Sequence, residues 1–295
     1  MAALATRGVA AAQLDVALLE RRKYSLTSAG LTFAAADGDV FIPADGSVRG
    51  WLRRLTPPQW RRDAAASSLE GAVRASWVAL VIGIARSCRI SWLSDIERLF
   101  LAENKLVQQA AAASLEIATP VTAVVASREQ IPPALGERFV AKPLGPGQFD
   151  DPQGRGQAVF TRELTRDARE LDTLGGAPFL LQQLLEADCH LRVVTVADRF
   201  WVCALKAQDL PLDWRREDSA HDAFVVSDDH GEVGERALAL TRALGVGYSS
   251  QDWVVARGRS YFLDLNPGGQ WLFLPDPVSS EVTAAIAEWL AGSTR

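Results

Sequence analysis

The chain runs Asp252-Trp-Val-Val-Ala256, Arg257-Gly258-Arg259, Ser260-Tyr-Phe-Leu-Asp264-Leu-Asn266-Pro267 near its C-terminal end. Two segments rich in β-branched and aromatic residues on either side of a glycine predict a β-hairpin. If the loop is the three residues 257–259, Asp252 pairs opposite Asp264 and Asn266 lies on their face. A loop of two or four residues would instead put the two carboxylates on opposite faces.

This hairpin predicts a magnesium site. Two carboxylates and an amide oxygen on one face are hard oxygen ligands of the kind that Mg²⁺ accepts, with phosphate oxygens and water completing the coordination. From the spacing alone, a pair of ordinary strand-end carboxylates is the simpler interpretation. The residues elsewhere in the chain therefore decide between the two.

A strand-borne lysine favours phosphate chemistry. Arg138-Phe-Val-Ala-Lys142-Pro143 predicts a short strand, and the glycine- and proline-rich segment 145–156 after it predicts a mobile loop. The lysine ammonium is a compact charge that suits a phosphate. Only four of the 31 basic residues are lysines. Three of them lie in elements expected near this site: Lys105 in a helix from 95 to 118, Lys142 in the strand just named, and Lys206 at the end of a strand at 200–206.

Helices and strands alternate through the remaining C-terminal two thirds. The expected elements are a helix from 95 to 118 with Leu99, Ala102, Leu106, Ala110 and Ala113 on one apolar face, a strand at 121–126, a helix at 162–174, a hairpin of 191–196 with 200–206, and a helix at 231–244.

The N-terminal third predicts a separate small α/β unit. Its expected elements are a helix at 3–13, a strand at 14–19, a hairpin of 31–34 with 40–42, a strand at 48–52 and a helix at 58–84. Residues 1–94 hold 12 basic and 7 acidic residues, a net charge of +5, whereas the remainder has −10. The basic third either attracts an acidic partner or simply carries solvated arginines.

Composition excludes several classes of protein. With 295 residues, 48% of them hydrophobic, and a net charge of −5, the chain is long and apolar enough for a globular core. Three separated cysteines argue against a disulfide framework or a zinc site. The acidic balance argues against nucleic-acid binding, and the lack of a signal or membrane-spanning pattern predicts a cytoplasmic protein.

Covalent catalysis and a nucleotide-binding P-loop are not indicated either. The sequence contains no Gly-x-Ser-x-Gly elbow and no Walker motif, and its three histidines are far apart in sequence.

Several motifs together resemble the ATP-grasp ligases. They are Phe139-Val-Ala-Lys142-Pro143, Pro178-Phe-Leu-Leu-Gln-Gln-Leu-Leu-Glu186, His190-Leu-Arg192-Val193, Asp213-Trp-Arg215, Asp252, and Asp264-Leu-Asn266-Pro-Gly-Gly-Gln-Trp271. More narrowly, they resemble the ATP-grasp maturases of ribosomal peptides, the graspetide synthetases of the microviridin type. Asp-Trp-Arg and Asn-Pro-x-Gly-Gln-Trp point to these maturases, and Gly50-Trp-Leu-Arg53-Arg54 is similar to a strand of their N-terminal domain.

The resemblance implies an α/β (α+β) ATP-grasp fold in three parts. Residues 1–94 would form a small N-terminal pre-ATP-grasp domain, 95–181 a central subdomain with a lid loop, and 182–295 a C-terminal subdomain with a hinge and the metal site. The nucleotide would lie between two antiparallel sheets.

The resemblance also implies roles for individual residues. Nucleotide binding falls to Lys105, Lys142, the lid glycines Gly145 and Gly147, the hinge residues Gln182, Gln183, Leu184, Leu185 and Glu186, and His190. Magnesium binding falls to Asp252, Asp264 and Asn266, catalysis to Arg192, Arg215 and Lys206, and precursor-peptide binding to Arg53 and Arg54. The family usually has glutamate in place of Gln183 and Asp264 and aspartate in place of His190.

The implied activity is that of a carboxylate ligase using ATP and Mg²⁺. It would activate Asp or Glu side chains of a ribosomal precursor peptide as acyl phosphates and close intramolecular ester or amide crosslinks. The expected partner is that precursor, with a leader and an acidic core; we expect a homodimer and no nucleic-acid or membrane partner. Two alternatives remain open: a ligase that adds amino acids to a peptide or to a free amino acid, and a nucleotide- or peptide-binding module without turnover.

Overall fold

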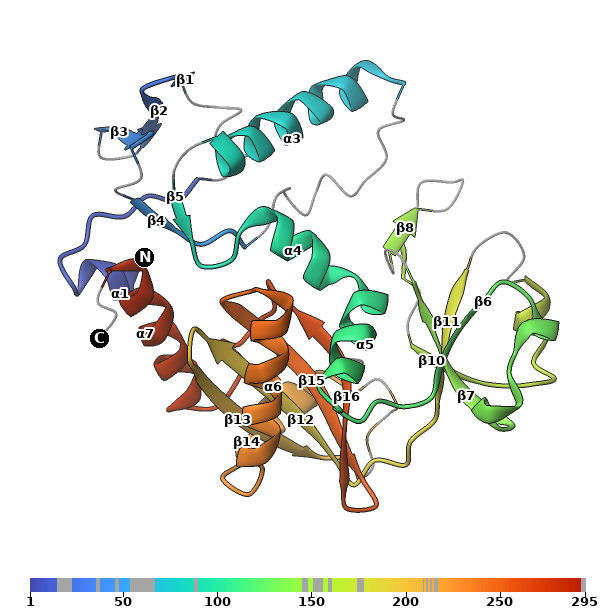
Figure 1. The fold of residues 1–295 in the computed structure, drawn as a ribbon. Helices are drawn as coiled ribbons and strands as arrows, with labels where there is room; N and C mark the ends of the chain where they lie inside the picture. The colour runs from blue at the N-terminus through green and yellow to red at the C-terminus, as the bar shows by residue number, and fades with distance from the viewer. Residues whose placement is uncertain are drawn as a thin grey trace.

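A computed structural model describes residues 1–14, 23–35, 38–45, 48–53, 67–87, 90–144, 148–150, 156–158, 161–173, 178–208, 210, 212, 214 and 217–292. Within these residues the elements gather around separate sheets, and the largest two sheets lie side by side in the lower part of Figure 1.

The largest sheet lies in the C-terminal part and has five antiparallel strands in the order β14-β13-β12-β15-β16. The bounds are β12 Cys189–Val196, β13 Arg199–Lys206, β14 Val225–Val226, β15 Tyr248–Ala256 and β16 Arg259–Asn266, with helices α6 Gly231–Leu244 and α7 Val278–Leu290 and a 3-10 helix at Asp218–Ala223. The expected hairpin of 191–196 with 200–206 and the expected helix 231–244 are confirmed.

Both faces of this sheet are covered. Leu191 and Val193 of β12 pack with Leu240 of α6, whereas Val194 on the opposite face packs with Val282 of α7. This follows from the alternation of side chains along a strand. A polar residue on β12 at an even-numbered position therefore interrupts the apolar face toward α7.

The second sheet is antiparallel and has the strand order β10-β7-β11-β6. Its strands are β6 Thr122–Val125, β7 Arg138–Pro143, β10 Arg162–Thr165 and β11 Phe179–Gln183; 3-10 helices at Arg128–Gln130, Pro133–Leu135 and Arg169–Thr173 adjoin them. The expected strands 121–126 and 138–143 are confirmed. The expected helix 162–174 is wrong, because Arg162–Thr165 pairs with β7 and buries Leu164.

The segment predicted as a mobile loop contains paired backbone. β8 Gln148–Asp150 and β9 Gly156–Ala158 form a two-stranded antiparallel hairpin. Gly145 and Gly147, named as lid residues, lie outside the described residues.

The N-terminal elements are α1 Ala2–Ala5, the antiparallel strands β1 Tyr24–Thr27, β2 Gly30–Ala35 and β3 Gly38–Pro43, the parallel pair β4 Val48–Gly50 and β5 Ile90–Trp92, and α3 Leu69–Ser87. The expected hairpin of 31–34 with 40–42 is confirmed. The expected helix 3–13 stops at Ala5, and Gly8 takes a positive φ of 67°. The expected strand 48–52 ends at Gly50, and the segments 15–22 and 54–66 lie outside the described residues.

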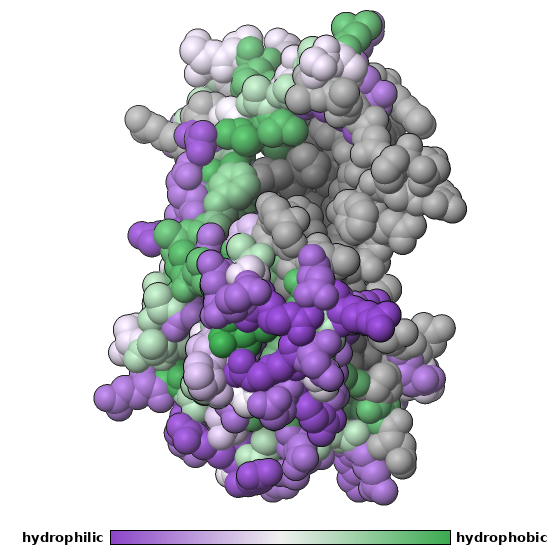
Figure 2. Space-filling model, turned by 90° about the vertical axis from the view of Figure 1, so that its right-hand side faces the viewer, coloured by the Kyte–Doolittle hydropathy of each residue, from purple (hydrophilic) through white to green (hydrophobic). Residues whose placement is uncertain are grey.

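Among the residues coloured in Figure 2, hydrophobic ones gather on the upper left of the view, and hydrophilic ones dominate its lower half. Of the helices that the structure describes, none is long and apolar enough to cross a membrane.

The helix expected from 95 to 118 is two helices. α4 Ile96–Glu103 and α5 Lys105–Ser114 meet at Asn104, whose φ of −80° and ψ of 115° are extended rather than helical. The Asn104 Oδ1 caps α5 by accepting hydrogen bonds from the backbone N–H groups of Leu106 at 3.0 Å and Val107 at 3.3 Å. The break shifts the buried face, so that Gln108 and Ala112 are buried and Leu106 is exposed.

The packing does not follow two of the expected domain boundaries. Leu99 and Ala102 of α4 and Ala112 of α5 share a core with α6 and the five-stranded sheet, although the boundary at 95 assigns them to the central part. The boundary at 181 falls inside β11, which continues to Gln183. Residues 96–114 therefore belong by contact to the C-terminal part.

Replacing Asn104 by alanine tests the helix break. We expect Asn104→Ala to lower the free energy of unfolding by about 1 kcal/mol, because two N–H groups lose their cap. Ser114→Ala, which removes an exposed hydroxyl at the other end of α5, should change it by less than about 0.5 kcal/mol. Urea denaturation measures both, and equal values for the two variants would contradict the capping role.

Candidate active site

Three strands align charged residues at one place. Arg192 on β12 pairs with Asp252 on β15, and Asp252 pairs with Asp264 on β16. Directly paired residues of antiparallel strands point to the same face. The three side chains therefore form a row across the sheet. Together with Lys105, whose contact with Asp264 is described below, we call them the charged row.

Asp252 pairs with Asp264, as a three-residue loop would require, but the loop is the shorter of the alternatives left open. The turn has two residues, Arg257 and Gly258, with φ values of 52° and 73° that suit a tight hairpin. Alone, this turn would put the carboxylates on opposite faces. A register shift between Asp252 and Trp253 restores the pairing through a β-bulge.

Each carboxylate of the row binds its own cation. Arg192 Nη1 donates to Asp252 Oδ1 at 2.6 Å, and Lys105 Nζ donates to Asp264 Oδ1 at 2.7 Å. The side chains are 10% and 23% exposed in the first pair and 28% and 32% exposed in the second. The row thus reads cation, carboxylate, carboxylate, cation, and the repulsion between the two adjacent carboxylates is offset from both ends.

The residues fit a magnesium ion that is bound together with a phosphate. Asn266 lies on the same face as Asp264, and its Oδ1 accepts a hydrogen bond from the Gly268 N–H at 2.9 Å. Among the described residues, no group of three His, Cys, Asp or Glu side chains could hold a metal ion. Two carboxylates and one amide are all oxygen donors, an incomplete set of the kind that Mg²⁺ completes with water and phosphate oxygens.

The segment that follows β16 packs too closely for side chains. A Cβ at Gly268 would lie 2.7 Å from the carbonyl oxygen of Arg53, and one at Gly269 would lie 2.6 Å from the Cβ of Ser250. The Tyr248 hydroxyl donates to the Gly269 carbonyl at 2.8 Å, and burial raises the pKa of Tyr248, which keeps it a donor. These contacts fix the backbone directly after the charged row.

Arg192 is held from several sides. Its Nη2 donates to the Gln270 carbonyl at 3.3 Å, and its guanidinium lies 5.8 Å from the centroid of the Phe273 ring. Its Nε is buried and has no hydrogen-bond partner in the described part of the chain. Arg192 is therefore a largely buried cation whose main charged contact is Asp252.

Arg53 lies beside the segment that follows β16. Its guanidinium stands 5.3 Å from the Trp271 ring centroid and 5.9 Å from that of Trp51. Trp51 also packs against Tyr248, at 5.4 Å between ring centroids. The N-terminal part thus contributes an arginine next to the charged row; Arg54 lies outside the described residues.

Lys142 lies on the neighbouring sheet. Its Nζ donates to Gln182 Oε1 at 2.7 Å, and Gln182 Nε2 donates to Thr122 Oγ1 at 3.1 Å. Gln182 is almost fully buried. The structure therefore brings two of the predicted nucleotide-binding residues together by a direct contact between β7 and β11.

The expected hinge connects the two sheets. Gln183 closes β11, where its N–H donates to the Val121 carbonyl at 2.8 Å. Leu184 and Leu185 are half-buried, whereas Glu186 is exposed and forms a 3.5 Å ion pair with the exposed Arg257. Such an exposed pair contributes little stability, so the segment is held mainly by its backbone.

His190 and Lys206 lie on different faces. His190 is two residues before Arg192 on β12 and shares its face. Lys206 pairs with Cys189, whose side chain packs on the opposite, α6 side. The sequence analysis grouped Lys206 with Arg192 and Arg215 for catalysis, but in the structure Lys206 and Arg192 lie on opposite faces of the sheet. Arg215 lies outside the described residues.

The sequence reasoning missed Gln108, a buried polar residue next to Lys105. Its amide bonds to the backbone of Leu265, between Asp264 and Asn266. The sequence does place a glutamine one helical turn after Lys105, at a position that the apolar face of the expected helix does not account for.

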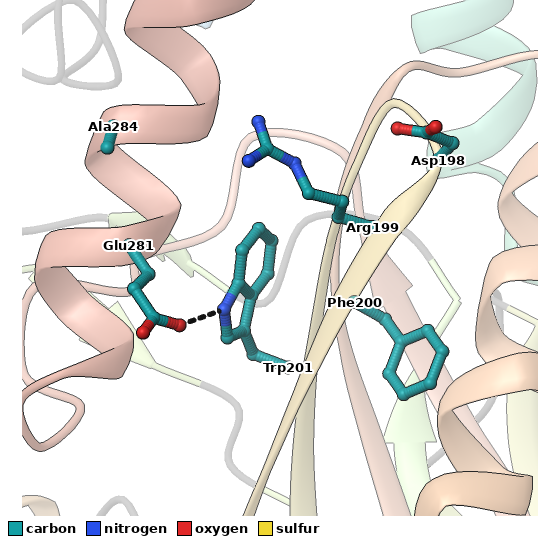
Figure 3. Close-up of a pocket in the computed structure, with 6 residues that line it drawn as sticks. All are labelled: Asp198, Arg199, Phe200, Trp201, Glu281 and Ala284. Atoms are coloured by element: carbon teal, nitrogen blue, oxygen red, sulfur yellow. Dashed lines mark hydrogen bonds between the residues drawn. The ribbon is translucent and has the colours of Figure 1, made fainter.

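A surface depression of about 470 Å³ lies elsewhere, between β13 and α7 (Figure 3). Three of its polar side chains are already paired: Trp201 Nε1 donates to Glu281 at 2.7 Å, and Arg199 donates to Glu288 at 2.6 Å. It lies at the opposite end of β13 from Lys206 and contributes nothing to the charged row.

Solved structures with the same fold were found by comparison. An ATP-grasp ligase from Chryseobacterium gregarium associated with ribosomal peptide modification, in complex with ADP and a leader and core peptide, has a TM-score of 0.84 at 21% identity over 99% of this chain and 92% of its own. The chain has the ATP-grasp fold. The macrocyclase MdnC from Microcystis aeruginosa, bound to precursor peptide MdnA, gives 0.81 at 21% identity over 98% and 93%.

The wider ATP-grasp fold is matched less completely. A D-alanine–D-alanine ligase from Bacillus anthracis has a TM-score of 0.53 at 16% identity over 72% of this chain and 74% of its own. The sequence matches no protein-family model and no curated protein. The expected ATP-grasp fold is confirmed, with the N-terminal elements included in the better matches.

Burial makes the contribution of the Arg192–Asp252 pair to stability testable. We expect Arg192→Met to lower the free energy of unfolding by about 2–3 kcal/mol, because it leaves Asp252 without its cation in a poorly hydrated place. The matched control is Arg86→Met, which breaks an exposed ion pair with Glu97 of the same 2.6 Å length and should cost less than about 1 kcal/mol. Chemical denaturation compares them, and a smaller effect for Arg192→Met would contradict the burial argument.

Proposed function

We propose that the chain is an ATP-dependent carboxylate ligase that crosslinks a ribosomally made precursor peptide. The observation that carries this proposal is the charged row, Arg192, Asp252, Asp264 and Lys105, set in an ATP-grasp fold. The row supplies oxygen ligands for a metal ion and positive charges at one place, and phosphoryl transfer requires both. The overall likeness to the two peptide-bound ligases supports a peptide substrate.

In this proposal ATP lies between the two large sheets. Lys142, in contact with Gln182, and Lys105 neutralise its phosphates, and the backbone of the hinge 184–186 faces the adenine. Asp252, Asp264 and Asn266 hold Mg²⁺, which when bound neutralises phosphate charge. Loop 145–156 is proposed to cover the triphosphate and exclude water.

The chemistry has two steps. A side-chain carboxylate oxygen of the peptide attacks the γ-phosphorus of ATP, and the bond between the γ-phosphorus and the β–γ bridging oxygen breaks. The products are ADP and a peptide side chain that carries an acyl phosphate. A hydroxyl or amine of the same peptide then attacks the acyl carbon; the acyl C–O bond to the phosphate breaks, and inorganic phosphate leaves and takes up the proton of the attacking group. Arg192, held against Asp252, stabilises the negative charge on the transferred phosphoryl group.

Arg53 is proposed to contact the peptide rather than the nucleotide. It belongs to the basic N-terminal part and reaches the segment after β16 through its contact with Trp271. A guanidinium beside two indole rings attracts carboxylates of an acidic core. The resemblance also implies a homodimer, and β1, an exposed strand at the edge of its sheet among the described residues, is a candidate contact; sedimentation equilibrium separates dimer from monomer.

The better fit of the peptide-bound ligases favours crosslinking over amino-acid addition. Those matches cover the N-terminal elements, whereas the D-alanine–D-alanine ligase match covers 72% of this chain. The pairing of Asp252 with Asp264 argues against a module without turnover, because two of the three proposed metal ligands lie directly opposite each other. A mass spectrum distinguishes the reactions, since each crosslink removes one water and each ligation adds a residue.

Turnover tests the proposal directly. With Mg-ATP and a short acidic, Thr/Ser/Lys-containing precursor peptide encoded beside the gene, we expect ADP release and loss of one water per crosslink. Asp252→Asn and Lys142→Met should each reduce the rate at least about 100-fold. The exposed lysine variant Lys23→Met is the control and should keep the rate, and chelation of Mg²⁺ should abolish it. ADP release that is insensitive to Asp252→Asn would overturn the metal assignment.

Charge reversal tests the role of the N-terminal arginines. We expect Arg53→Glu/Arg54→Glu to raise the Kd for the fluorescently labelled precursor at least about tenfold, because two attractive charges become repulsive. Arg74→Glu/Arg86→Glu on α3 changes the net charge equally and should leave the Kd within about twofold. Equal effects of the two double variants would show that net charge alone is responsible.

A further inference from the structure

Gln108 connects α5 to the proposed metal strand. Its Nε2 donates to the Leu265 carbonyl at 2.8 Å, and its Oε1 accepts from the Leu265 N–H at 3.0 Å. The same Nε2 donates to the Ala102 carbonyl at 2.7 Å. The side chain is 2% exposed, so every one of these bonds is shielded from water.

These three bonds meet specific needs of the backbone. β16 is the last strand of its sheet, and the Gln108 amide pairs with Leu265 as a further strand would. The Ala102 carbonyl lies in the last turn of α4, where carbonyls lack a helical partner because the chain breaks at Asn104. One side chain thus joins the end of α4, the start of α5 and the edge of β16.

The position of Gln108 relates it to the charged row. Lys105 lies three residues earlier on α5, so the two side chains lie on neighbouring positions of one helix face. Asp264 directly precedes Leu265. The amide bonds of Gln108 and the 2.7 Å Lys105–Asp264 ion pair therefore connect the same two elements one helical turn apart.

We propose that Gln108 is a positioning residue that holds Lys105 and Asp264 at the distance needed for a magnesium-bound nucleotide. This rests on the proposed function, because it assigns Lys105 to phosphate and Asp264 to the metal. An apolar residue in this place would fill the space but let α5 shift along the edge of β16. Because the side chain of Asp264 is short, it can do little to compensate for a change in its distance from Lys105.

The test measures binding of the non-hydrolysable ATP analogue AMPPNP with Mg²⁺ by calorimetry. Gln108→Met keeps size and burial and removes all three bonds; we expect it to raise the Kd at least about tenfold. Thr241→Val is the matched control, a buried α6 residue bonded to Ala237, Thr195 and Ser249. It should lower the melting temperature comparably and leave the Kd within about twofold.

A double-mutant cycle separates positioning from loss of stability. If Gln108 acts through Lys105, Gln108→Met should change the Kd less than about threefold in a Lys105→Ala background, whereas a general destabilisation would act equally in both. If Gln108→Met does not fold, Gln108→Asn, which is too short to reach Leu265, is judged by the same criteria. An unchanged Kd in a folded variant overturns the proposal while leaving the function intact; failure of the wild-type chain to bind Mg-AMPPNP overturns the proposed function itself.

Discussion

The site depends on holding two carboxylates next to each other on neighbouring strands. Directly opposed like charges destabilise a sheet, and paired Cα atoms are only about 5 Å apart. Asp252 and Asp264 are held in this arrangement by a bulge that sets the register and by one cation at each end of the row. The bulge, the break between α4 and α5, and the glycines after β16 all serve to bring those partners into place.

Local patterns predicted the elements whose burial matches a simple period. β7, the hairpin of β12 with β13, and α6 are such cases, because each buries one regular set of apolar residues. The helix expected at 95–118 failed because alanine-rich sequence continues the period past Asn104, while the break is stabilised by a bond from Gln108 to a strand 157 residues away. Arg162–Thr165 failed because a four-residue strand that buries one leucine carries too little pattern.

The site residues were predictable as identities but not as neighbours. The motifs named Asp252, Asp264, Lys142 and Arg192, and the hairpin pattern allowed the carboxylates to share a face only if the loop had three residues. The chain instead uses a two-residue turn and brings the carboxylates opposite each other through a bulge. Lys206 shows the reverse failure: it ends an expected strand and is one of only four lysines, but strand alternation puts it across the sheet from Arg192. Contacts between elements distant in sequence, such as Arg53 with Trp271, leave no local pattern.

The two ion pairs also suggest how the row accepts a charged ligand. A buried carboxylate without a cation is costly, and so is a buried cation without an anion. Here Arg192 neutralises Asp252 and Lys105 neutralises Asp264 in the free chain. In the proposed function, a metal ion that is bound together with a phosphate would contact the two carboxylates, while the two cations would face the phosphate. No charge is left unpaired at either stage, so binding exchanges partners rather than creating new buried charges. In the same proposal, a phosphate without the metal, or the metal without a phosphate, would break this balance, so we expect the two to bind together.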